Sequence, residues 1–122
     1  MTFEDGLGER HLVVDRAHEP VEMLCLRGEL TSVPSFEFAL RERVSRLATF
    51  RHTCYRHVRS VERLKDSGST LALVSDATNG VRLSEILAFA ERENIPLDID
   101  AALCLLRQLV PAVAMLQARA GV

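Results

Sequence analysis

The sequence AALCLLRQLVPAVAM at residues 101–115 is the most informative stretch of this 122-residue chain. Its only strongly polar residues are Arg107 and Gln108, so it has the composition of a helix that is apolar on every side. An amphipathic surface helix keeps a polar face, whereas a helix that is apolar all round has neighbours on every side. A chain this short has little other material to cover it. We therefore expect a protein partner, a second copy of the chain or a further domain to cover this helix.

Composition places the rest of the chain among ordinary soluble proteins. Hydrophobic residues make up 48% and charged residues 26%, and the net charge of -2 gives no reason to expect nucleic acid as a partner. No apolar leader opens the sequence, and the apolar runs are too short and too interrupted to predict a membrane span. The three cysteines are odd in number and far apart, which favours reduced, buried thiols. We expect one cytoplasmic domain without a membrane partner.

The first half of the chain alternates strand and helix signals. HLVVD at residues 11–15 and VEMLCL at residues 21–26 have the composition of short strands. Residues 35–49 repeat apolar side chains at helical spacing, and Ser35 is a candidate N-cap. A second pair of strands, residues 55–64 and 71–74, flanks a turn at residues 66–69. The apolar residues expected to point inward from these segments are Phe36, Leu40, Val44 and Leu47 in the helix and Val58, Val61 and Leu64 in the strand.

The second half predicts two helices. After a polar linker at residues 75–80, Ser84 is a candidate cap for a short helix that ends near Glu93. Asp98 or Asp100 is the candidate cap of the last helix, and Pro111 is expected to bend it. The order predicts an α+β fold: a small antiparallel sheet packed on one helix, then a hinge and two C-terminal helices. We expect a single domain over residues 1–122, with the sheet and first helix in 1–76 and the hinge and last helices in 77–122.

Four local matches occur in an order and at spacings that one family shares. Phe-Arg-His at residues 50–52 is similar to the Leu-Arg-His after a kinase αC helix, and LALVSD at residues 71–76 is similar to the strand before the hinge. NGVRLS at residues 79–84 is similar to the Gly-x-x-Leu segment after the hinge, and residues 101–118 to the αE helix. The chain thus resembles the small lobe of a serine/threonine protein kinase, followed by the hinge and two large-lobe helices. This resemblance covers nearly the whole chain.

The resemblance implies a phosphate-binding loop that is poorly suited to ATP. GLGERHLV at residues 6–13 follows the Gly-x-Gly-x-x-Gly-x-Val pattern, except that His11 replaces the third glycine. Glu9 adds negative charge where phosphate oxygens would lie. The alternative is that Gly6 and Gly8 are simply two glycines in a polar N-terminal arm.

The other kinase positions lack the residues that phosphoryl transfer uses. VEMLCLR aligns with Val-Ala-Ile-Lys-Val-Leu-Arg and puts Leu24 at the lysine, while Arg43 stands at the αC glutamate with Glu42 one residue away. The catalytic loop and Asp-Phe-Gly segment would follow Val122. The resemblance therefore implies a pseudokinase or kinase fragment without catalytic residues or a cofactor, and we expect no ATP binding.

Two alternatives to this interpretation stay open. One is the N-terminal part of a larger atypical kinase that binds ATP with a cation from elsewhere, although Lys65, the only lysine, is badly placed. The other is a small α+β adaptor with a helical-hairpin interface.

Other chemical groups in the sequence have structural explanations. His52, Cys54 and His57 include a Cys-x-x-His spacing, but too few further ligands accompany them, and we expect no metal site. A Cys54 nucleophile with His57 as its base lacks a third group. The arginines of residues 41–46 alternate with glutamates, as on a solvated helix face.

We expect the chain to act in protein–protein interaction or as a scaffold, with a protein partner or in a homodimer. Exposed apolar surface on the scale of the last helix seldom stays uncovered. The residues expected to form the interface are Leu105, Leu106, Leu109, Val113 and Leu116.

Overall fold

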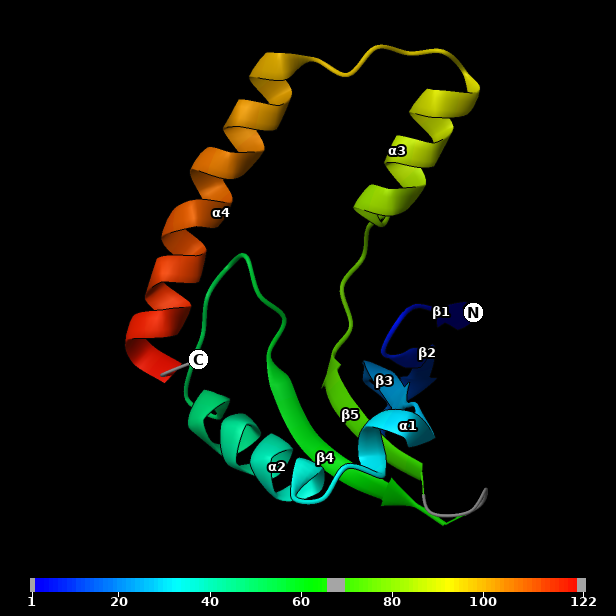
Figure 1. Ribbon diagram of the computed structural model, residues 1–122, viewed down its shortest axis with the longest axis vertical. Helices are drawn as coiled ribbons and strands as arrows, with labels where there is room; N and C mark the ends of the chain where they lie inside the picture. The colour runs from blue at the N-terminus through cyan, green and yellow to red at the C-terminus, as the bar shows by residue number, and fades with distance from the viewer. Residues whose placement is uncertain (1, 66–69, 121–122) are drawn as a thin grey trace.

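The computed structural model describes residues 2–65 and 70–120, and Figure 1 shows an α+β fold. The strands are β1 (Thr2–Glu4), β2 (Gly8–Val14), β3 (Pro20–Leu26), β4 (Val58–Leu64) and β5 (Thr70–Asp76). The helices are α1 (Gly28–Thr31), α2 (Phe36–Leu47), α3 (Leu83–Arg92) and α4 (Ile99–Ala120). All strand pairs are antiparallel, in the order β1-β2-β3-β5-β4. The predicted fold class is confirmed at this level, and the turn predicted at residues 66–69 lies outside the described residues.

The core lies between one face of the sheet and α2. Leu24 and Leu26 of β3 join Val61 of β4 and Leu71 of β5 in a buried cluster. The strand period of two puts Leu24 and Leu26 on the same face, and their burial stabilises the sheet. The expected inward residues of α2 that pack against this cluster are Phe36, Leu40 and Val44.

A β-bulge corrects the expected inward face of β4. Val58, Val61 and Leu64 are spaced by three, and a regular strand would turn Val58 and Val61 to opposite faces. The register shifts between Val58 and Ser60, so Val58 pairs with Ser75 and Val61 with Leu73 on the α2 side. Leu64 stands opposite Thr70 and faces the other side of the sheet.

The predicted helix caps have three different outcomes. Asp98 precedes α4, and its Oδ1 accepts the Asp100 N–H at 3.0 Å, as expected of an N-cap. Ser35 precedes α2 but has φ 66° and no capping hydrogen bond from its side chain. Ser84 was the wrong choice, because α3 begins at Leu83 after Arg82.

The N-terminus is a hairpin rather than a loose arm. β1 pairs with β2 from Thr2 opposite His11 to Glu4 opposite Glu9. Gly8 has φ 152°, and a Cβ there would lie 1.9 Å from the Cys25 carbonyl oxygen. Gly8 is therefore required by the close approach of β3, a role that needs no ligand.

The last two helices extend away from the sheet (Figure 1). The C-terminal end of α4 lies near α2, whereas its N-terminal half projects beyond the sheet. α4 has 22 residues, seven more than the stretch that predicts it, and continues through Pro111. At 1.5 Å per residue it is about 33 Å long.

Candidate functional site

The position aligned with the kinase lysine is part of the hydrophobic core. Leu24 is 4% exposed and belongs to the cluster under α2. The two αC-position candidates, Glu42 and Arg43, are both exposed, and Glu42 pairs with Arg46 at 2.7 Å. Neither is placed to form an ion pair with a residue at position 24.

A buried carboxylate lies on the same face of β3, two residues before Leu24. Glu22 is only 9% exposed and lies 2.9 Å from Arg10 and 2.5 Å from Arg56. Arg82 is the third guanidinium, 3.7 Å away. These arginines come from β2, from the segment before β4 and from the linker before α3. We call Glu22, Arg10, Arg56 and Arg82 the Glu22 cluster.

The arginines keep Glu22 ionised despite its burial. Burial raises the pKa of the Glu22 carboxyl, but hydrogen bonds and charges from Arg10 and Arg56 outweigh this effect, and the pKa lies below its usual value. Arg10 also pairs with Asp5 at 2.7 Å, and the Arg82 guanidinium lies 3.8 Å from the centre of the Phe3 ring. The cluster thus ties the N-terminal hairpin and the linker before α3 to the sheet.

Aromatic contacts order the segment that brings Arg56 to Glu22. The Phe50 and His52 rings stack with centroids 6.3 Å apart, and Tyr55 lies 5.9 Å from Phe50 and 5.7 Å from His52. Phe50 is buried. The Phe-Arg-His segment therefore packs as a structural unit between α2 and β4.

The residues expected in a phosphate-binding loop lie inside a strand. Glu9 pairs with Cys25 and His11 with Met23 in the β2–β3 ladder, and the Glu9 and His11 side chains are 3.3 Å apart. Gly6 lies in the turn between β1 and β2, where Asp5 accepts the Leu7 N–H. The loop interpretation is wrong for Glu9 and His11, because backbone pairing with β3 continues as far as Gly8.

The histidines and cysteines are used locally. His52 Nδ1 accepts the Cys54 N–H at 3.0 Å, and His57 Nδ1 contacts Arg51. Within residues 2–65 and 70–120, no group of three or more His, Cys, Asp or Glu could hold a metal ion. Cys25 is half-buried as a free thiol, but Cys54 and Cys104 are exposed, so the expectation of buried thiols was wrong for these two.

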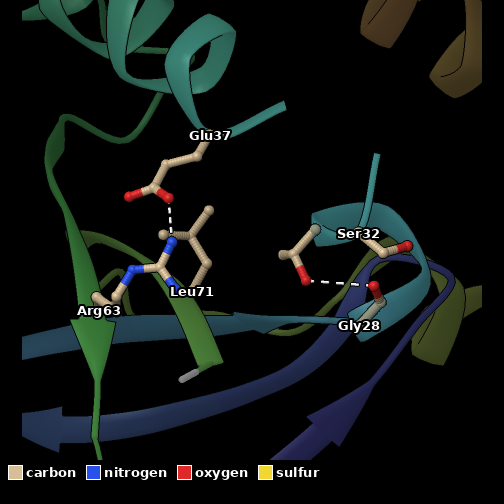
Figure 2. A pocket seen from close by; sticks show the side chains of 6 residues that line it. Gly28, Ser32, Glu37, Arg63 and Leu71 are labelled. Atoms are coloured by element: carbon tan, nitrogen blue, oxygen red, sulfur yellow. Dashed lines mark hydrogen bonds and ion pairs between the residues drawn. The ribbon is translucent and has the colours of Figure 1, made fainter. Parts of the chain in front are cut away.

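A small cavity of about 210 Å³ lies between α1, the start of α2 and the sheet (Figure 2). Glu37 and Arg63 form an ion pair on one side of it, and the Thr31 hydroxyl donates to the Gly28 carbonyl on the other. Leu71 lies at its base. Arg41 also hydrogen-bonds Glu37. Because its carboxylate is already paired twice, we assign this cavity a structural role.

The apolar side chains of α4 are mostly uncovered by the rest of the described chain. Ala112 is buried and Leu116 half-buried, whereas the other α4 residues with described side chains are exposed. The expected interface residues Leu105, Leu106, Leu109 and Val113 all belong to the exposed group, and the structure places them along one helix. The exposed apolar residues of α4 that composition alone did not single out are Ile99, Leu103, Val110 and Met115.

The length of α4 corrects one expectation. Residues 99–119 have a mean hydropathy of 1.7 and are long and apolar enough to cross a membrane, although the apolar runs looked too short. The helix is longer than the run because Ile99 and Asp100 begin it and residues 116–120 extend it. Length and composition alone do not place a helix in a bilayer, since core helices have the same properties.

Comparison of the chain with protein-family models finds no match, and no curated protein matches it either.

Proposed function

We propose that this chain is a non-catalytic, protein kinase-like domain that works in the cytoplasm by protein–protein interaction through α4. The observation that carries the proposal is the exposed apolar surface of this helix. A contiguous apolar surface of this kind on a soluble domain is typical of an interaction site. The residues we assign to the interaction surface are Leu105, Leu106, Leu109, Val113 and Leu116.

The sheet supports the non-catalytic part of the proposal. A kinase uses a lysine on its third strand to hold the α- and β-phosphates of ATP. Here Leu24 is buried in the core, and the next residue along that face is Glu22, whose negative charge would repel phosphates. The kinase-like order of strands and helices is the basis for the family assignment, which is itself part of the proposal.

Sedimentation velocity combined with binding of an apolar fluorescent dye tests the interaction surface. We expect self-association, dye binding, or both, because the α4 surface is either covered by another molecule or open to the dye. A stable monomer that binds no dye would count against the proposal. The matched variant Leu106→Glu should reduce whichever signal the wild type gives.

The second candidate is an ATP-binding part of a larger atypical kinase, and the Glu22 cluster is the observation that favours it. Arg10, Arg56 and Arg82 converge on the sheet face that carries Glu22, so cations are present there without a lysine. Thermal-shift titration with ATP and magnesium separates the two candidates. We expect no saturable stabilisation, whereas a saturable shift that is lost in Arg56→Ala would favour the ATP-binding candidate.

A further inference from the structure

One side of α4 carries a regular apolar stripe that faces away from the rest of the chain. Ile99, Leu103, Leu106, Val110 and Val113 follow one another at steps of four, three, four and three residues. Their exposed fractions run from 45% at Val113 to 75% at Ile99. We call these five residues the α4 stripe.

A neighbouring row of α4 is turned toward the chain itself. At 100° per residue, Leu105, Leu109, Ala112 and Leu116 fall within about 60° of one another, beside the stripe. Ala112 is fully buried and Leu116 half-buried, in agreement with the contact between α4 and α2. The chain thus uses one row of α4 internally and leaves the adjacent stripe open.

The spacing of the stripe indicates a helical occupant. Alternating steps of three and four give the 3.5-residue period of a coiled-coil seam, in which a second helix packs side chains between those of the first. Arg107 lies about 40° beyond the edge of the stripe, where it can stay in water next to a helix. In a bilayer the same arginine would lie near the middle of the span, at a substantial energetic cost.

We propose that the α4 stripe pairs with the α4 stripe of a second copy of this chain, in antiparallel orientation. This inference rests on the proposed function and names its partner. Antiparallel pairing about Gln108 sets Leu106 opposite Val110 of the second copy and Leu103 opposite Val113. Ile99 then lies opposite Gln117 at each end. Every inner layer is aliphatic on both sides, and two-fold symmetry forms each layer twice.

The arrangement of the domain favours antiparallel over parallel pairing. Each sheet lies at the C-terminal end of its α4, and the N-terminal half of the helix projects beyond it (Figure 1). Antiparallel helices keep the two sheets at opposite ends of the pair, whereas parallel helices would bring both sheets to the same end.

The size of the surface predicts moderate affinity. A helix about 33 Å long and about 10 Å wide offers a face of about 330 Å² in projection. Stable complexes commonly bury about 800 Å² of accessible surface per partner, so this pair is on the small side. We therefore expect dimerisation that depends on concentration, with a dissociation constant in the micromolar range.

Sedimentation velocity over a hundredfold concentration range reaching about 100 μM tests the pairing. The wild type should shift from monomer to dimer. Leu106→Glu should weaken association by about thirtyfold or more, because it puts a charge in a central layer. Gln108→Glu, on the polar side of the same helix, is the matched control and should dimerise like the wild type. Circular dichroism checks that both variants stay folded.

Disulfide trapping tests the orientation in a background with Cys25→Ser, Cys54→Ser and Cys104→Ser. The double variant Leu103→Cys/Val113→Cys should form a covalent dimer on mild oxidation, and Leu103→Cys alone should not. Within one chain the two positions are about 15 Å apart along the helix, too far for an internal disulfide. Efficient trapping of the single variant would refute antiparallel pairing.

The outcomes separate this inference from the proposed function. A wild type that stays monomeric but binds the apolar dye overturns the second copy as occupant and leaves an interaction surface for another protein. A monomer that binds no dye overturns both. A monomer that co-sediments with phosphatidylcholine vesicles overturns the pairing in favour of a membrane.

Discussion

Replacing Leu24 by lysine restores the residue that a kinase has at this position, and the structure predicts that it damages the fold. Leu24 is 4% exposed and contacts the core cluster of Leu26, Val61 and Leu71. Loss of a buried leucine side chain alone costs about 2–5 kcal/mol. The lysine must then either stay unpaired in the core or distort the sheet to reach water.

We expect Leu24→Lys to lower the free energy of unfolding by about 4 kcal/mol, a large part of the 5–15 kcal/mol typical of a domain. Leu12→Lys is the matched control, because Leu12 lies on the same sheet face of the neighbouring strand but is 56% exposed. Its cost should stay within about 1 kcal/mol.

Urea unfolding followed by circular dichroism measures both variants against the wild type. The midpoint should fall strongly for Leu24→Lys and little for Leu12→Lys, with similar slopes. If Leu24→Lys is as stable as Leu12→Lys, position 24 opens to solvent as a ligand-binding lysine would, and the assignment of Leu24 to the core is refuted.

Three further variants and a pH series test the sheet. Glu22→Gln should cost about 2–4 kcal/mol in chemical denaturation because it leaves converging guanidinium groups without their carboxylate, whereas Glu42→Gln, in an exposed pair, should cost less than about 0.5 kcal/mol. The pKa of Glu22 is lowered in the fold, so its contribution is present above the usual value of 4.5 and is lost as the pH falls below it; the wild type should lose stability in that range more steeply than Glu22→Gln, and parallel curves would contradict this. Gly8→Ala should cost about 2–4 kcal/mol because its Cβ would collide with the Cys25 carbonyl, and Gly6→Ala, with nothing within 4 Å, should be nearly neutral; equal melting temperatures for the two would contradict the close approach.

The regular elements were predictable because their patterns are local. Apolar spacing from Phe36 to Leu47 predicted α2, and the strand composition of residues 21–26 predicted β3 to within one residue. The first strand was missed because it has only three residues in a polar segment. The bulge in β4 was missed because it depends on the register with β5, which composition does not record.

The Glu22 cluster could not be predicted from the sequence. Its members come from four separate segments and meet only when β2, β3, the segment before β4 and the linker before α3 are folded together. The apolar character of α4 was visible at once. The division of its surface into an internal row and an open stripe required the position of α2, because both rows are equally apolar.

The account depends on the α4 stripe being covered in solution by another molecule of this chain. Hydrogen exchange measured at two protein concentrations, one below and one above the expected dimerisation range, tests this directly. The account predicts that amides of residues 99–117 exchange more slowly at the higher concentration while those of β3 exchange at an unchanged rate. Identical exchange of residues 99–117 at both concentrations, with fast exchange throughout, would contradict it.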